Sequence, residues 1–307
     1  MLKIKKGKIN IEKTAFMAIL SNIVYDPFNK YHIWLNKKTN QIVRQLILKP
    51  YKPLKQTIML QFLEIITIPK DDPIAFTFFT GYMAMMAASI FFFFERSRVD
   101  KKWQLSLLIS GLITFIAAVH YYYMKDYYLA TGENPTSLRY IDWTLTVPLM
   151  CVEFYLLTAA AGAKKSLLWK LIIASVWMLV FGYIGEAFNP EGGSASHSVI
   201  YGVLSTLGYL YILYTVWVGE VAQLAKKSNN PAIISSVRIL AWFVLVGWAI
   251  YPIGYMCMDG GWLNTSLGWG SGNVDLFYNI ADAINKIGFG LVVYSLAVSA
   301  SKDKVSA

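Results

Sequence analysis

Long apolar runs alternate with short polar segments along most of the chain. Seven of these runs are long enough for a membrane-spanning helix, which needs about 20 mostly apolar residues. We place them at residues 73–94, 104–124, 138–159, 167–187, 198–219, 234–256 and 276–299. The pattern therefore predicts an all-α membrane protein, built as a bundle of seven transmembrane helices in a lipid bilayer.

The first 70 residues do not share this pattern. They hold 13 Lys or Arg against 3 Asp or Glu, and four prolines interrupt any long helix. A basic, acid-poor leader is typical of organelle targeting, but its aromatic and aliphatic residues equally suit a segment lying on a membrane surface. We predict two parts, a basic extension at 1–70 and a helical domain at 71–307, and the role of the extension stays open.

Composition and charge agree with a membrane protein. The chain is 56% hydrophobic and 15% charged, with a net charge of +10. Basic residues gather after the first, third and fifth runs and in the tail (Arg96, Arg98, Lys101, Lys102, Lys164, Lys165, Lys170, Lys226, Lys227, Arg238, Lys302, Lys304). The other loops are acidic, with Lys125 the exception. This bias predicts cytoplasmic odd-numbered loops and C-terminus, an N-terminus outside, and no nucleic-acid partner. It does not identify the membrane.

The last run carries two charges near its middle, Asp282 and Lys286. A charge at the centre of a bilayer is costly, so such residues usually face the protein interior and mark function. The two are four positions apart and share one helix face. One interpretation is a buried structural ion pair. The other is an amine held in a dry pocket, where it can form a Schiff base with a carbonyl compound.

The third run holds the densest set of polar residues: Arg139, Asp142, Thr146 and Glu153. At ~100° and ~1.5 Å per residue, Asp142 and Glu153 lie about 20° apart around the helix and roughly 16 Å apart along it. Two acids on one face suit a proton relay, or simply a helix facing a wet crevice. In the second run, His120 is either a satisfied core residue or the partner of a facing carboxylate.

Two separated motifs carry a family resemblance. RYIDWTLTVPL followed by CVEFYLL in the third run, and NIADAINKIGFG in the last, closely resemble the proteorhodopsin branch of microbial rhodopsins. The similarity extends from about residue 73 to 300 and leaves the first 70 residues uncovered. It implies a seven-helix bundle with all-trans retinal in its centre, bound as a Schiff base to Lys286.

The resemblance also assigns roles by position. Asp142 matches the primary counterion and proton acceptor, Asp282 the second counterion, and Glu153 the cytoplasmic proton donor. Arg139 matches the arginine beneath the counterions, and His120 the histidine that pairs with the acceptor. The roles imply that protons move outward across the membrane.

The transported ion follows from the same comparison. The set Asp142, Thr146 and Glu153 differs from the Asn, Asp and Gln of the family's sodium pumps, and chloride pumps lack the acceptor carboxylate. Protons are therefore the implied ion. The chain offers no metal site, and Cys151 and Cys257 lack metal or disulfide spacing.

The implied retinal pocket draws on the third to sixth spans, in addition to Lys286 in the seventh. Its positions are Trp143, Met150, Met178, Gly182, Ser205, Tyr209, Trp248, Tyr251, Pro252 and Tyr255. Taken alone, such spacings in the fourth, fifth and sixth runs are those of ordinary core packing. An apolar Met150 implies green rather than blue absorption. Gly202 matches a position where glycine opens a window for a carotenoid antenna in some relatives, although backbone packing is the commoner reason for a membrane glycine.

The resemblance thus implies a light-driven outward proton pump that builds a proton gradient, and not an enzyme. It also implies a homo-oligomer, a pentamer or hexamer. Three alternatives remain at this point: a sensory photoreceptor, a light-gated ion channel, and a transporter that does not use retinal.

Overall fold

The computed structural model describes residues 68–69, 71–188, 195–258, 261, 263–264 and 274–302. Nearly all of the predicted N-terminal extension lies outside these residues. The long elements are α4 (Pro73–Glu95), α5 (Gln104–Thr131), α6 (Thr136–Ala159), α7 (Lys165–Ala187), α8 (Ala195–Trp217), α9 (Glu220–Lys227), α10 (Pro231–Trp242), the π-helical turn η3 (Phe243–Gly247), α11 (Ile250–Cys257) and α13 (Val274–Lys302).

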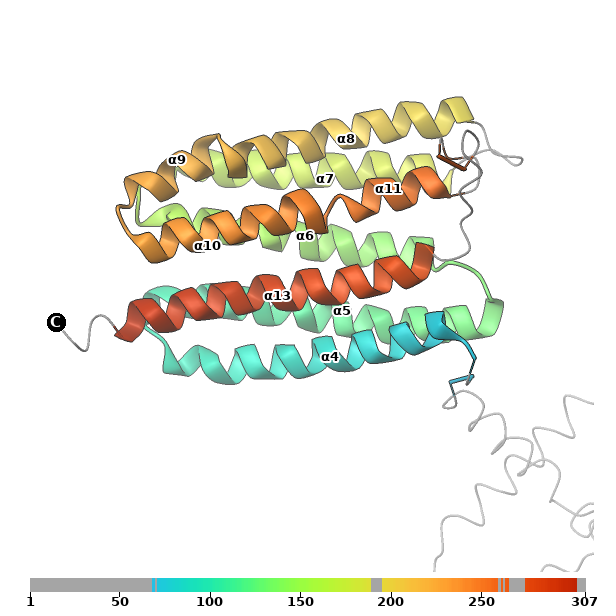
Figure 1. The fold of residues 1–307 in the computed structure, drawn as a ribbon, viewed down its shortest axis with the longest axis horizontal. Coiled ribbons are helices and arrows are strands. Elements are labelled where there is room, and N and C mark those ends of the chain that lie inside the picture. Colours follow the sequence, from blue (N-terminus) through green and yellow to red (C-terminus); the bar gives the residue numbers. More distant parts are fainter. Residues whose placement is uncertain are drawn as a thin grey trace, which may run out of the picture. The chain divides into compact units, whose positions relative to one another are not determined.

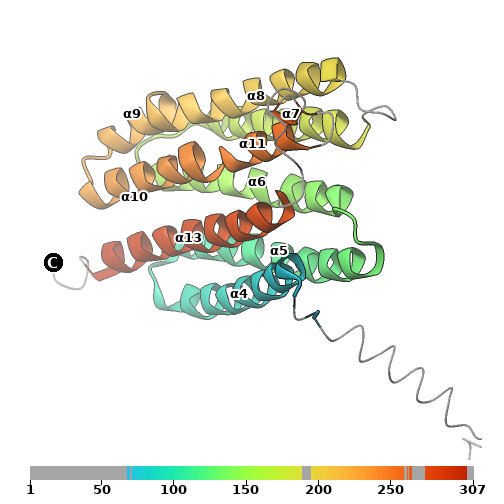
Figure 2. The ribbon, with the colours of Figure 1, turned by 45° about the vertical axis from the view of Figure 1, so that its right-hand side comes forward.

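Within the described residues, seven helical stretches are long and apolar enough to cross a membrane, which confirms the predicted seven-helix class. Helices that follow one another from α4 to α8 pack side by side. The ring then closes, because α10 packs on α8 and α13, and α13 packs on α4 and α5 (Figures 1 and 2). The protein is an integral, multi-pass membrane protein.

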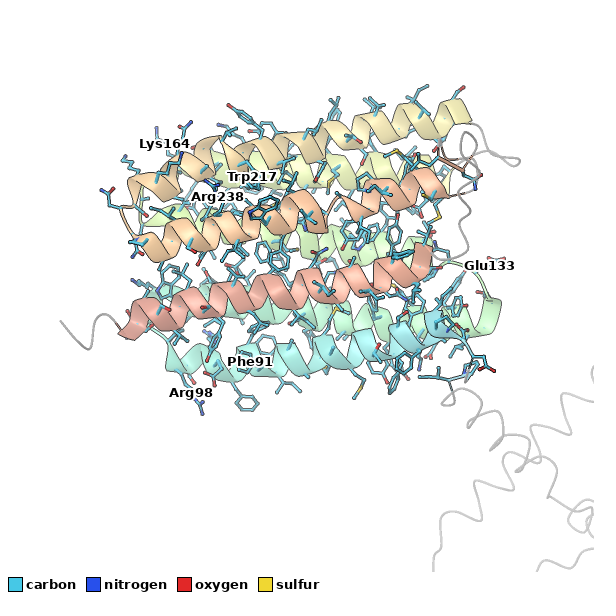
Figure 3. All side chains as sticks on the ribbon, viewed as in Figure 1. Phe91, Arg98, Glu133, Lys164, Trp217 and Arg238 are labelled. Atoms are coloured by element: carbon cyan, nitrogen blue, oxygen red, sulfur yellow. The ribbon has the colours of Figure 1, made fainter. Side chains whose placement is uncertain are left out.

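The bundle buries polar groups and exposes apolar ones, as expected in lipid. Large side chains such as Phe94, Trp169 and Ile173 are exposed, whereas Arg139 and Glu153 are buried. The charged side chains differ between the two ends. Arg98, Lys164 and Arg238 lie toward one end of the bundle and Glu133 at the other (Figure 3).

The second span corrects one prediction. We expected it to end at residue 124, but α5 continues to Thr131 and ends at Gly132, whose φ is +73°. Lys125 is only 6% exposed. Its ammonium pairs with Asp126 at 3.1 Å and lies 4.9 Å from the ring centre of Tyr122, so these charges do not end the helix.

The sixth span is broken near its middle, close to Pro252. The backbone N–H of Trp248 donates to Phe243 O, five residues back, at 2.9 Å. The π-helical turn therefore separates α10 from α11. Because Pro252 has no N–H, the helix cannot form its usual bond to Trp248 O, which accepts from Tyr251 at 3.2 Å instead.

Candidate functional site

The centre of the bundle contains a buried amine between two acids. Nζ of Lys286, on α13, lies 2.6 Å from Oδ2 of Asp142 on α6 and 3.1 Å from Oδ2 of Asp282, one turn earlier on α13. The side chains of all three are at most 3% exposed. As expected, Asp282 and Lys286 lie on the same face of α13, and Asp142 contacts Lys286 from α6.

Asp282 is held by three donors from three other helical segments. Tyr121 donates to Oδ2 at 2.7 Å and Tyr251 to Oδ1 at 2.6 Å. The indole Nε1 of Trp143 lies 3.1 Å from Oδ2 and 3.2 Å from Oδ1. Buried tyrosine and tryptophan usually satisfy their polar atoms in this way. Both carboxylate oxygens are thus fixed. Tyr121 was not foreseen, because the run of three tyrosines in its span gives no reason to choose the first.

Asp142 has a looser environment. One of its oxygens, Oδ2, accepts from Lys286, while Oδ1 accepts no hydrogen bond from the residues that the structure describes. Nδ1 of His120 lies 3.8 Å from Oδ1 but only 2.9 Å from the carbonyl of Ile116. Thr146 is buried and donates to the backbone carbonyl of Asp142 at 2.9 Å rather than to the carboxylate.

Arg139 is buried near the N-terminal end of α6, at the same end of the bundle as Glu133. Its Nη2 lies 2.6 Å from Oδ1 of Asp275, and both terminal nitrogens lie 3.2 Å from Oδ1 of Asn279. The rings of Phe78 and Tyr278 are centred 5.5 Å and 5.2 Å from the guanidinium carbon. Asp275 lies just before the last predicted span, which begins at residue 276, but the structure places it in the first turn of α13, facing Arg139.

Glu153 lies toward the opposite end of α6. It is fully buried, and its Oε1 accepts from Ser110 on α5 at 3.2 Å. Its other oxygen has no hydrogen-bond partner among the described residues. A buried carboxyl group with hydroxyl donors and one oxygen to spare is able to hold a proton and pass it on.

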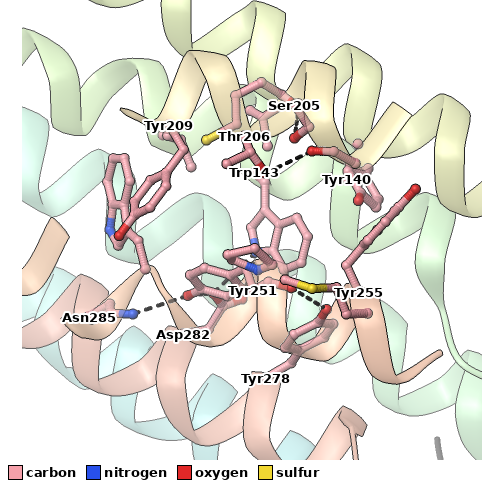
Figure 4. Close-up of a pocket in the computed structure, with 18 of the residues that line it drawn as sticks. Tyr140, Trp143, Ser205, Thr206, Tyr209, Tyr251, Tyr255, Tyr278, Asp282 and Asn285 are labelled. Carbon is pink, nitrogen blue, oxygen red and sulfur yellow. Dashed lines mark hydrogen bonds between the residues drawn. The ribbon is translucent and has the colours of Figure 1, made fainter. Parts of the chain in front are cut away.

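A cavity of about 320 Å³ adjoins the amine, within the usual range for small-molecule sites. Its lining includes Lys286, Asp282, Gly202 and all the residues that the resemblance placed around retinal: Trp143, Met150, Met178, Gly182, Ser205, Tyr209, Trp248, Tyr251, Pro252 and Tyr255. Figure 4 shows several of them around the cavity, with side chains from α6, α8, α11 and α13. The cavity is mostly aromatic and aliphatic, with its charged groups at one side.

Comparison with known proteins gives a consistent result. The family model described as "Bacteriorhodopsin-like protein" matches residues 72–300. A green-light absorbing proteorhodopsin from Gamma-proteobacterium EBAC31A08 is 42% identical over 238 residues, covering 76% of this chain and 90% of the relative.

Solved structures agree. The crystal structure of blue light-absorbing proteorhodopsin from Med12 has a TM-score of 0.62 at 38% identity, covering 75% of this chain and 100% of that one. Xanthorhodopsin, described as a light-driven ion pump with dual chromophore, has a TM-score of 0.63 at 29% identity, covering 75% of this chain and 94% of that one.

Proposed function

The chain belongs to the family of bacteriorhodopsin-like proteins, and from that premise we propose that it is a light-driven outward proton pump carrying retinal on Lys286. The observation that carries the proposal is the buried amine at the edge of an apolar cavity, 2.6 Å from one acid and 3.1 Å from another. The first acid can take a proton and the second can balance charge.

The residues around the cavity fit retinal. The space of about 320 Å³ is lined by apolar and aromatic side chains, which suits a polyene. At Gly182 an added Cβ would lie 3.0 Å from Tyr140 Oη and 3.3 Å from Ser205 Oγ, so the glycine lets these two lining side chains lie close to α7. When bound, all-trans retinal supplies the absorption of visible light and an isomerisation that alters the surroundings of the Lys286 nitrogen.

The proton route follows α6. Asp142 accepts the proton from the Lys286 nitrogen, because its Oδ2 already lies 2.6 Å away. Asp282 is the second counterion, fixed by its three donors. Glu153 then returns a proton from the other side. Arg139 balances the charge of the two acids, and His120 assists Asp142.

The direction rests on the distribution of charge. α6 runs from Thr136, after Glu133, to Ala159, before Lys164. The basic end is cytoplasmic by the positive-inside bias. Asp142 then lies on the outer side of Glu153, and protons leave outward. The same bias puts the N-terminus outside and the C-terminus in the cytoplasm.

Further details extend the proposal. We assign residues 71–307 to the rhodopsin domain and 1–70 to a separate extension. The protein acts as a pump and not as an enzyme, absorbs green light because Met150 is apolar, and assembles as a pentamer or hexamer in the bilayer.

A carotenoid antenna is a second proposed cofactor. Gly202 lines the cavity together with Val199 and Val203, whose side chains are 43% and 56% exposed on the outside of α8. A Cβ at Gly202 would lie 2.9 Å from Cε1 of Tyr255. The glycine lets the Tyr255 ring lie directly against α8 at the cavity, and the exposed surface of Val199 and Val203 beside it is where we propose that a lipid-borne carotenoid binds.

Illumination of retinal-fed cells in unbuffered medium tests the pump. We expect the medium to acidify in light and a protonophore to abolish the change. Lys286→Ala cells provide the control for heating and respiration. A sensory photoreceptor would give no acidification and a much slower photocycle, and a light-gated channel would give a photocurrent that reverses with voltage. Either result would overturn the proposal.

A further inference from the structure

The break in the sixth span leaves backbone carbonyls without their usual helical donors. Trp248 N–H bonds to Phe243 O, so the carbonyl of Val244, its partner in a regular α-helix, is released. Tyr251 N–H bonds to Trp248 O, which releases the carbonyl of Gly247. Buried carbonyls need donors, so their new partners decide how firmly the break is held.

Two neighbouring helices supply those donors. The hydroxyl of Tyr209, on α8, lies 3.0 Å from Val244 O and 3.1 Å from Leu245 O. The amide of Asn285, on α13, donates to Gly247 O at 3.0 Å. Glycine is needed at 247, because a Cβ there would run into the Asn285 amide. The break is therefore fixed by side chains from α8 and α13.

Asn285 also contacts the charged site. The same Nδ2 lies 3.2 Å from the hydroxyl of Tyr251, a contact visible in Figure 4. That hydroxyl donates to Asp282 at 2.6 Å. Asn285 directly precedes Lys286 and is 3% exposed. A continuous chain of hydrogen bonds thus joins Asp282 through Tyr251 and Asn285 to the carbonyl of Gly247.

We propose that Asn285 is a positioning residue that couples the charged site to the break in the sixth span. Its two amide hydrogens hold the Tyr251 hydroxyl toward Asp282 and the Gly247 carbonyl toward α13. A change of charge at Asp282 or Lys286 that moves the Tyr251 hydroxyl therefore also loosens the π-helical turn. π-helical turns inside α-helices are often found at functional sites, which agrees with this role.

Asn285→Leu tests the proposal, because leucine has a similar volume and no hydrogen-bonding group. The full chain is reconstituted in lipid with retinal, and two quantities are measured. Amide hydrogen exchange across residues 243–251 should be roughly fivefold faster, as expected for one lost hydrogen bond. The visible absorption maximum in the dark should shift, because the Tyr251 hydroxyl is no longer oriented toward Asp282.

A double-mutant comparison separates coupling from general damage. If Asn285 acts on colour through the Tyr251 hydroxyl, Asn285→Leu should add little shift in a Tyr251→Phe background. Its effect on exchange should persist there, since the Gly247 carbonyl is still released. The matched control is Trp217→Phe, which removes the 3.0 Å bond to Ala241 O just before the break. That control should leave the absorption maximum unchanged.

Unchanged exchange at 243–251, an unchanged absorption maximum, or an equal shift in both backgrounds would each overturn the proposal. If Asn285→Leu forms no pigment, Asn285→Ser replaces it with the same expectations, since serine cannot reach both partners. The colour measurement rests on the proposed retinal site, whereas neither readout involves proton transport. A protein that binds retinal and does not pump can therefore still pass or fail this test.

Discussion

The side-chain nitrogen of Lys286 lies 2.6 Å from Oδ2 of Asp142, nearer than the 3.1 Å that separates it from Asp282. The two acids also differ in what surrounds them. Both oxygens of Asp282 accept from tyrosine or tryptophan, while Oδ1 of Asp142 has no donor within the described part of the chain. Protonation of Asp142 changes only its hydrogen bond with Lys286, whereas protonation of Asp282 would also disturb its bonds from Tyr121, Tyr251 and Trp143, which favours Asp142 as the acceptor.

Asp142→Asn should abolish light-driven acidification, by roughly 100-fold or more, because the amide cannot accept the proton. The colour should survive but shift, since Lys286 remains and a counterion is lost. Acidification and the absorption spectrum are measured on the same retinal-fed cells. Asp126→Asn, which removes the outer acid paired with Lys125 at 3.1 Å, is the control and should pump normally. Normal pumping by Asp142→Asn would refute its assignment.

Glu153→Gln should slow the return of a proton to the Lys286 nitrogen while leaving the first proton transfer intact. Glutamine keeps the bond to Ser110 but cannot release a proton. Flash photolysis resolves the two phases, and the late phase should lengthen by roughly 100-fold. Glu186→Gln offers a matched control, because Glu186 also accepts from neighbours, Thr136 and Tyr140, at the other end of the bundle. An unaltered late phase in Glu153→Gln would remove Glu153 from the route.

Most of the fold could be predicted from sequence, because bilayer thickness fixes the length of a span. The first span was expected at 73–94 and is Pro73–Glu95. The predicted end of the second span, residue 124, was wrong because Lys125 is buried against tyrosines from two helices and α5 continues to Thr131. The π-helical turn at Phe243–Gly247 was not foreseen either, since the partners of its freed carbonyls come from other helices.

The candidate site, like the fold, could be predicted from the sequence only in part. Spacing along one helix correctly placed Asp282 beside Lys286, and Asp142 and Glu153, which spacing put on one face of α6, are both buried. Contacts between helices depend on how each helix is rotated, so the partners Tyr121, Asn279 and Asp275 were missed. The residues lining the cavity followed from the family resemblance, because their spacing alone equally describes a packed core.

Asp275→Asn should destabilise the bundle by about 1.5–3 kcal/mol, the range for a hydrogen bond to a charged group. The change leaves the buried Arg139 without its carboxylate partner, although Asn279 still accepts from it. The free energy of unfolding is measured by denaturant titration of the coloured protein. Glu220→Gln, at an exposed pair 3.4 Å from Lys170, should cost less than about 1 kcal/mol. An equal loss of unfolding free energy in the two variants would contradict the role of Asp275 as the buried carboxylate partner of Arg139.

Lys286→Ala should give a folded protein that stays colourless after retinal is added, because alanine has no amine to bind the aldehyde. The visible absorption spectrum of purified protein is the measurement. Lys125→Ala is a demanding control, since Lys125 is also buried, 6% exposed against 3% for Lys286.

The two lysines differ in their surroundings rather than in their burial. Lys125 pairs with Asp126 outside the cavity, between the rings of Tyr82 and Tyr122. Lys286 instead lines the apolar cavity between two acids. We therefore expect Lys125→Ala to turn pink and Lys286→Ala to remain colourless. If Lys286→Ala still forms a pigment, another amine binds retinal. The assignment of Lys286 would then be wrong, and so would the roles of Asp142, Asp282 and Glu153, which depend on it.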